Sequence, residues 1–219
     1  PHERKIINDP VFGFINIPKG LLYDIVRHPL LQRLTRIKQL GLSSVVYPGA
    51  QHTRFQHSLG AFHLTSEAVQ QLASKGNFIF DSEAEAVQAA ILMHDIGHGP
   101  FSHVLEDTIV QGVSHEDISL MLMERINKEM NGQLTLAIQI FKDEYPKRFL
   151  HQLVHLPRLF ADRKHLHDQR CKQLTGGCCS QKTLTAFNPA AHLTDPSGHE
   201  GVIDSLGDHI QRLVQRNTG

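Results

Sequence analysis

A nearly continuous run of apolar helix formers, Ala86 to Met93, leads directly into a dense polar segment, residues 94–103, HDIGHGPFSH. Charged side chains are rarely placed at the end of a buried helix without a partner. The glycines at positions 97 and 99 and the proline at position 100 supply backbone freedom and stop regular helix. We therefore expect a buried helix that turns several polar side chains towards one common point.

The polar side chains of this segment are His94, Asp95, His98 and His103. Neutral imidazole combined with carboxylate is a ligand mixture that suits a divalent transition metal. Any one of these residues could instead belong to an ordinary hydrogen-bonded His–Asp pair. The chain also contains 16 histidines, an excess that an imidazole-based site would explain. The group as a whole is a candidate metal site.

Composition excludes several classes of protein. The 219 residues include 22 acidic and 22 basic side chains, so the overall charge predicts no attraction to nucleic acid or anionic lipid. There is no apolar run of about 18 residues, and the sequence from Pro1 to Lys5 lacks the apolar core of a signal peptide. The three cysteines are an odd number and crowd one region, which does not favour a disulfide framework. We expect a cytoplasmic protein without membrane spans.

The N-terminal third combines a turn, an extended segment and a helix. Residues 4–18 carry Asn-Asp-Pro followed by alternating apolar residues, which predicts a short hairpin or extended arm. Apolar positions between Pro29 and Leu40 have helical spacing, and Gly41 is a plausible stop. The polar side of this predicted helix is basic, which is more often a solvated surface than a binding patch.

A second polar cluster follows the Pro48-Gly49 loop and consists of His52, Arg54 and His57. Helical spacing resumes from Ser58, so His57 is expected near a helix start. Arg54 lies a turn or less before His57, where a planar guanidinium could hold a phosphate approaching a metal bound by His57. The alternative for Arg54 is a surface arginine paired with a carboxylate.

Capping patterns mark further helices. Ser82 and Glu85 have the spacing of a capping box for the helix that leads into the central motif, residues 94–103. Ser114 is expected to cap a later helix, which places His115 and Glu116 at its N-terminus. That position favours anions and could line a phosphate pocket, although both residues could be ordinary capping residues.

The helix after Ser114 should bury one apolar face, and a short helix and an apolar segment follow it. The expected core side consists of Ile118, Met121, Leu122 and Ile126. Residues 104–106, before this helix, and 134–141, after it, are also expected to be helical, and an apolar pattern resumes over 149–154.

The character of the chain changes after Val154. Large apolar residues become sparse, all three cysteines appear, and amphipathic spacing returns only over residues 202–214. We therefore divide the chain into a domain over residues 1–154 and a divergent tail over residues 155–219. The tail is interpreted as a truncated or frame-altered end of the domain.

Four segments together resemble the HD-domain phosphohydrolases. They are INDPVFGFI, QRLTRIKQLGLSSVVYPGAQHTRFQHSLGAFHL, ILMHDIGHGPFSHVLE and SHEDIS, in the family's order over about residues 6–126. The pattern is most similar to the deoxynucleoside triphosphate triphosphohydrolase branch, which includes the sterile-alpha-motif and HD-domain restriction factor of vertebrates. The resemblance implies an all-α HD-domain helical bundle, here with a short N-terminal extended arm or hairpin and an atypical C-terminal tail.

The resemblance also implies a metal-ligand set. It assigns the metal to His57, His94 and Asp95, with a second aspartate contributed by a later helix. The family pattern there is similar to DVDRMDYLRRD, and in this chain only Asp162-Arg163 matches it. Asp162 is therefore the candidate for the fourth ligand.

The remaining site residues follow from the same resemblance. Arg54 and His103 would contact phosphate, and His98 would be a catalytic imidazole. His115 and Glu116 would support the reacting water and His98. The implied cofactor is a divalent metal ion, which could be Mn, Fe, Zn, Ni or Mg.

The sequence thus leads to two hypotheses for function. The first is a metal-dependent phosphohydrolase acting on nucleotides, with deoxynucleoside triphosphate cleaved to deoxynucleoside and triphosphate. The alternative is a nucleotide or nucleic-acid binding module with an incomplete, inactive HD site. The resemblance also implies a homo-oligomer.

Overall fold

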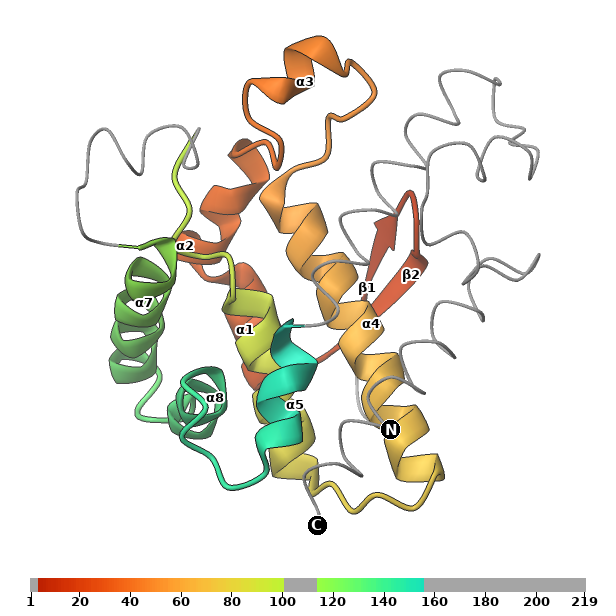
Figure 1. Ribbon diagram of the computed structural model, residues 1–219, viewed down its shortest axis with the longest axis vertical. Coiled ribbons are helices and arrows are strands. Elements are labelled where there is room, and N and C mark those ends of the chain that lie inside the picture. The colour runs from red at the N-terminus through yellow and green to blue at the C-terminus, as the bar shows by residue number, and fades with distance from the viewer. Residues whose placement is uncertain (1–3, 101–113, 156–219) are drawn as a thin grey trace.

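The computed structural model describes residues 4–100 and 114–155 (Figure 1). Within these ranges the chain is mostly helical, and its sheet has two strands. The expected all-α architecture with an N-terminal hairpin is confirmed. None of the described helices is both long enough and apolar enough to cross a membrane.

The hairpin pairs β1 (Arg4–Asp9) with β2 (Gly13–Pro18) in antiparallel register. Asp9 forms the turn: its Oδ1 accepts hydrogen bonds from the backbone N–H groups of Val11, at 2.8 Å, and Phe12, at 3.0 Å. An aspartate that binds the backbone two residues further on is a standard way to start a turn. Alternate side chains of β2 then enter the core: Ile15 and Ile17.

The helix expected over residues 29–40 is only partly confirmed, because helical structure ends at Arg36. Helix α1 (Leu21–Arg27) precedes a short α2 (Pro29–Gln32), and a 3₁₀ turn, η1 (Arg33–Arg36), follows. The chain then becomes extended, because Ile37 accepts a hydrogen bond from the backbone N–H of Arg54 at 2.8 Å. Pairing with a distant segment overrides the helical spacing of the apolar residues.

Helix α4 (Arg54–Ser74) begins four residues earlier than the expected Ser58, after the short helix α3 (Ser43–Val46). A capping box fixes this start: Thr53 Oγ1 accepts from the N–H of Gln56, and the Gln56 side chain accepts from the N–H of Thr53 at 2.9 Å. His57 consequently lies in the first turn of α4, as expected.

Helix α5 (Asp81–Met93) is the central element and packs against α1, α4 and α8. Residues 89–93 are completely buried, which confirms that a buried helix delivers the central motif. Its N-terminus is organised by Glu83 instead of the expected Ser82–Glu85 pair. The buried Glu83 carboxylate accepts hydrogen bonds from Phe80 N–H at 2.9 Å, Tyr145 Oη at 2.6 Å and Lys147 Nζ at 2.7 Å.

Replacing Glu83 with Ala is expected to lower the free energy of unfolding by roughly 2–3 kcal/mol, because it leaves three donors without their buried acceptor. A thermal melt should show a midpoint lower by about 4–10 °C. Glu85→Ala, an exposed change on the same helix, is the control and should shift the midpoint by less than about 2 °C. Equal midpoints for the two variants would contradict this role for Glu83.

The hydrogen bonds of Glu83 also make the stability of the fold depend on pH. Burial raises the pKa of Glu83, but the hydrogen bonds from Lys147, Tyr145 and the backbone of Phe80 outweigh it and lower the pKa overall. A lowered pKa in the folded state stabilises the fold above the unfolded-state value of about 4.3, and this stabilisation is lost as the pH falls through the folded-state value. The stability gap between the wild type and Glu83→Ala should therefore shrink in acid.

Helices α7 (His115–Glu129) and α8 (Thr135–Phe141) both match the expected segments. Ser114 and Asp117 form the cap of α7: Ser114 Oγ accepts from the N–H of Asp117 at 3.1 Å, and Asp117 accepts from the N–H of Ser114 at 3.0 Å. The expected core face is partly wrong, because Met121 is 62% exposed. Ile126 is buried as expected, and the other buried side chains of α7 are Ser119 and Met123.

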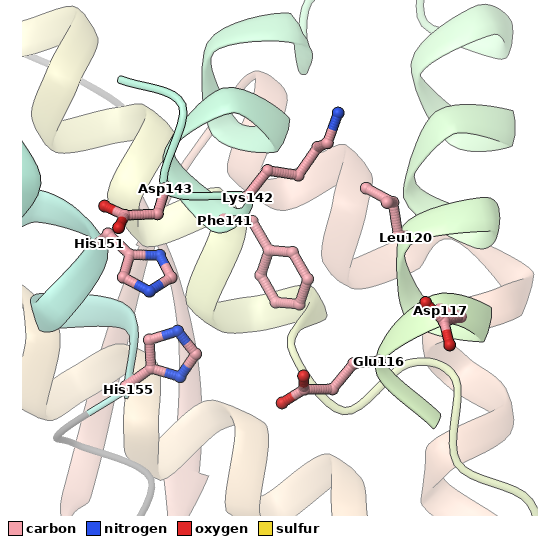
Figure 2. Close-up of a pocket in the computed structure, with 8 residues that line it drawn as sticks. All are labelled: Glu116, Asp117, Leu120, Phe141, Lys142, Asp143, His151 and His155. Carbon is pink, nitrogen blue, oxygen red and sulfur yellow. The ribbon is translucent and has the colours of Figure 1, made fainter. Parts of the chain in front are cut away.

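Residues 148–155 are helical and carry the apolar pattern expected over 149–154. Together with α7 and α8 they line an open pocket of about 390 Å³, shown in Figure 2. The expected helix over residues 104–106 lies outside the described residues.

Candidate metal centre

The polar cluster lies where α5 ends. His94 caps the helix, and a tight turn follows in which Ile96 N–H bonds to Met93 O and His98 N–H bonds to Asp95 O. This turn keeps successive side chains close together instead of distributing them around a helix. The first turn of α4 approaches from the other side and contributes His57.

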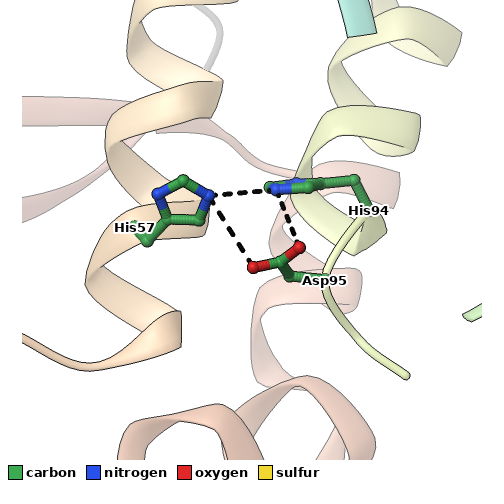
Figure 3. Close-up of side chains that lie close together, drawn as sticks. All are labelled: His57, His94 and Asp95. Carbon is green, nitrogen blue, oxygen red and sulfur yellow. Dashed lines mark hydrogen bonds and ion pairs between the residues drawn. The ribbon is translucent and has the colours of Figure 1, made fainter. Parts of the chain in front are cut away.

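His57, His94 and Asp95 bring their ligand atoms together, as Figure 3 shows. The two Nε2 atoms of the imidazoles lie 3.1 Å apart. Asp95 Oδ1 lies 3.2 Å from His94 Nε2, and Asp95 Oδ2 lies 3.7 Å from His57 Nε2. All three side chains are buried.

These separations fit one shared ion. Two ligand atoms bound to one ion at about 2.0–2.2 Å lie roughly 2.8–3.6 Å apart in octahedral or tetrahedral geometry. The separations of 3.1 and 3.2 Å lie within that range, and the separation of 3.7 Å lies just above it. Two imidazole nitrogens and the two oxygens of one carboxylate at such distances also form a concentrated set of electron-pair donors, which a divalent cation would stabilise.

A backbone contact sets the tautomer of His94. Its Nδ1 lies 2.6 Å from the carbonyl oxygen of Ile91 and must carry the proton in that hydrogen bond. The lone pair is therefore on Nε2, the atom that faces His57 and Asp95. Metal-binding histidines commonly have this arrangement, because the hydrogen bond fixes both the tautomer and the ring orientation.

Asp95 is held as a carboxylate by its surroundings. Burial alone would raise the pKa of Asp95, but its electrostatic interactions with His94, His57, His98 and Arg54 hold it well below its usual range. Arg54 Nη1 donates a hydrogen bond to Asp95 Oδ2 at 2.9 Å. Of the two expectations for Arg54, pairing with a carboxylate is observed, but in the interior and not at the surface, since only 3% of the arginine is exposed.

The other predicted site residues differ in their relation to this cluster. His98 is buried, with its Nδ1 3.6 Å from Asp95 Oδ1, and its ring contacts that of His115 at a tilt of 39°, with centroids 4.1 Å apart. Glu116 lines the pocket in Figure 2. His52 is buried and pairs its backbone carbonyl with the N–H of Gln39. His103 and Asp162 lie outside the described residues.

Two residues that support the turn were not predicted. The buried Ser119 Oγ accepts from Gly97 N–H at 2.9 Å and donates to the carbonyl oxygen of His94 at 3.1 Å. Arg33 donates to the carbonyl oxygen of Ile96 from the 3₁₀ turn η1. Both side chains form hydrogen bonds with backbone atoms of the motif. The one sequence signal for Ser119 was its position at the end of SHEDIS.

Comparison with known proteins agrees with the helical fold and the His-His-Asp cluster. Residues 54–152 match the HD domain family. The chain therefore contains an HD domain, and His57, His94 and Asp95 lie within it.

The chain is also similar to several individual proteins. The chain is 42% identical over 130 residues to the deoxynucleoside triphosphate triphosphohydrolases SAMHD1 of Bos taurus and Homo sapiens, covering 56% of this chain and 22% and 21% of those proteins. It is 40% identical over 117 residues to the uncharacterised Bacillus subtilis protein YwfO, covering 53% of this chain and 27% of that protein. The chain thus spans about a quarter of the length of these relatives.

The structure is also similar to the crystal structure of a phosphohydrolase from Bacteroides thetaiotaomicron. The TM-score is 0.71 and the sequence identity is 83%, over 75% of this chain and 43% of that one.

Proposed function

We propose that this chain carries the metal site of a phosphohydrolase that acts on nucleotides and cleaves a deoxynucleoside triphosphate to deoxynucleoside and triphosphate. The convergence of His57, His94 and Asp95 on one point is the observation that carries the proposal. The names of the relatives support the class of substrate.

In this proposal His57, His94 and Asp95 hold a divalent ion, with Asp162 as the fourth protein ligand. The ion would be Mn, Fe, Zn, Ni or Mg, and when bound it would withdraw charge from phosphate oxygens and make nearby water more acidic. Arg54 places a fixed positive charge next to these ligands, where the phosphates of a substrate would approach. His103 is the second proposed phosphate contact.

His98 is the proposed proton-transfer residue. The reaction breaks the bond between the α-phosphorus and the 5′ oxygen, and the departing oxygen must gain a proton. The imidazole of His98 lies close to Asp95 and contacts the ring of His115, so it is held beside the cluster. In this scheme His115 and Glu116 support His98 and the reacting water.

Product analysis tests the proposal. The purified chain is incubated with each of the four deoxynucleoside triphosphates and Mn²⁺, Mg²⁺ or Fe²⁺, and products are separated by anion-exchange chromatography. We expect deoxynucleoside and triphosphate in equal amounts, and no release in the presence of a chelator. If no nucleoside forms although metal is bound, the enzyme hypothesis is wrong, and nucleotide binding without turnover would then support the alternative of an inactive binding module.

Replacement of His98 by Ala is expected to lower turnover by about a hundredfold to ten-thousandfold, the usual contribution of general acid–base catalysis. Bound metal should stay at the wild-type level, because His98 is not among the proposed ligands. The control is His63→Ala, which removes a half-buried imidazole of α4 that contacts Phe12. Turnover of His98→Ala equal to that of the control would remove His98 from the mechanism.

A further inference from the structure

A second group of metal-binding side-chain types lies in the pocket between α7, α8 and residues 148–155 (Figure 2). The wall formed by the end of α8 and the helical segment 148–155 contributes Asp143, His151 and His155. Glu116 contributes a carboxylate from the opposite wall. None of these side chains is one of the three that form the His57–His94–Asp95 cluster.

His151 and His155 are four residues apart on one helical segment. Their ring centroids lie 4.2 Å apart, in an edge-on arrangement with an interplanar angle of 61°. Residues at this spacing share one face of a helix, and two histidines so placed can bind one ion together. Both side chains are half-buried and line the pocket.

The tautomer of His151 is set in the same way as that of His94. Its Nδ1 lies 2.9 Å from the carbonyl oxygen of Ile140 and carries the proton in that hydrogen bond. The lone pair is therefore on Nε2, which is the tautomer that a metal ligand requires.

Asp143 supplies a carboxylate oxygen. Its Oδ2 accepts a hydrogen bond from Arg148 Nη2 at 2.7 Å, which fixes the side chain. Its Oδ1 is buried and has no hydrogen-bond partner among the described residues. A buried acceptor without a partner is costly, and a bound cation would remove that cost. Asp143 also interacts electrostatically with both His151 and His155.

We propose that His151, His155 and Asp143 form a second site for a divalent transition metal ion of the zinc, nickel or copper type. Two imidazoles and one carboxylate are a ligand set that suits these ions. Within the described ranges only His57, His94 and Asp95 bring three ligand atoms within 4.8 Å of one another. The second site is therefore looser, needs a side-chain rotation to close, and binds metal more weakly than the first.

Zinc titration by calorimetry, with the full chain stripped of metal, separates the two sites. The wild type should show a tight and a weak class of binding. His155→Ala should lose the weak class and keep the tight one, whereas Asp95→Asn should do the reverse. His63→Ala, which removes an imidazole elsewhere, should keep both classes. Wild-type binding by His155→Ala would overturn the proposal.

A matched pair of variants tests whether Asp143 is a ligand. Asp143→Asn should weaken the second class about tenfold or more, whereas Glu144→Gln, a neutralisation at the adjacent exposed position, should leave it unchanged. Equal zinc affinity in these two variants would exclude Asp143 as a ligand.

Should His155→Ala fail to fold by circular dichroism, the same zinc titration of His155→Gln decides, because glutamine keeps a polar side chain of similar length but lacks the imidazole nitrogens. Loss of the weak class supports the second site, and its retention overturns it. Nucleoside release is measured on the same proteins. The proposed function can therefore fail while the second site is retained, and the reverse is equally visible.

Discussion

Asp95→Asn is expected to abolish tight metal binding by the HD site while leaving helix content nearly unchanged. Asparagine keeps the size of the side chain and can still accept the hydrogen bond from Arg54. It removes the negative charge that offsets a divalent cation and the positive charge of Arg54 in a buried site. We expect the affinity of the tight class to fall by at least about a hundredfold, more than the usual loss from removing a residue behind a ligand.

Metal analysis after dialysis, combined with circular dichroism, measures this effect. Asp9→Asn is the matched control, since Asp9 is also a buried aspartate but forms the hairpin turn far from the cluster in sequence. The control should retain the wild-type metal content. Wild-type metal content in Asp95→Asn would show that Asp95 belongs to a packing pair and not to a metal site.

Gly97→Ala is expected to damage both the fold and the site. A Cβ atom at position 97 would lie 2.3 Å from the carbonyl oxygen of His115, 2.4 Å from Ser119 N and 2.7 Å from Ser119 Oγ. Two of these atoms are backbone, so the start of α7 would have to move away from the motif. That movement would break the hydrogen bonds of Ser119 to Gly97 and His94, at a cost of about 3 kcal/mol or more.

Gly99→Ala is the matched control, because a Cβ atom there meets no atom of the described residues within 4 Å. Thermal melts and metal affinity should both separate the two variants. Gly97→Ala should melt roughly 6–12 °C below the wild type and bind metal more weakly, whereas Gly99→Ala should stay close to the wild type. If the two alanines behave alike, α7 does not fix the geometry of the motif.

The sequence predicts most of the helices and the centre of the site because these depend on local patterns. The apolar run before His94, the cap at Ser114 and the turn at Asp9 each lie within a few residues of the feature that they specify. The helix predicted over residues 29–40 fails for the opposite reason. The chain leaves the helix after Arg36 because Ile37 pairs with Arg54, and that contact is not encoded in the helical spacing.

The supporting residues could not be predicted for a similar reason. Ser119 reaches the motif across 22 residues to Gly97, and Glu83 bonds to Lys147 across 64 residues. Neither pairing has a local signature. The predicted buried face of α7 was wrong at Met121. This apolar residue is exposed, whereas the polar residue Ser119 lies on the buried face.

Asp162 and His103 stay predictions, as does the division of the chain between residues 154 and 155. Asp162 is the more consequential residue, because a fourth protein ligand would complete the coordination that His57, His94 and Asp95 begin.

Anomalous X-ray diffraction from crystals of the chain grown with Zn²⁺ tests the central claim most directly. We predict the strongest peak at about 2.0–2.2 Å from the Nε2 atoms of His57 and His94 and from a carboxylate oxygen of Asp95. An Asp162 oxygen at the same distance would identify the fourth ligand. A chain that crystallises in this fold with zinc elsewhere, and no peak between His57, His94 and Asp95, would contradict the assignment of this cluster as the metal centre.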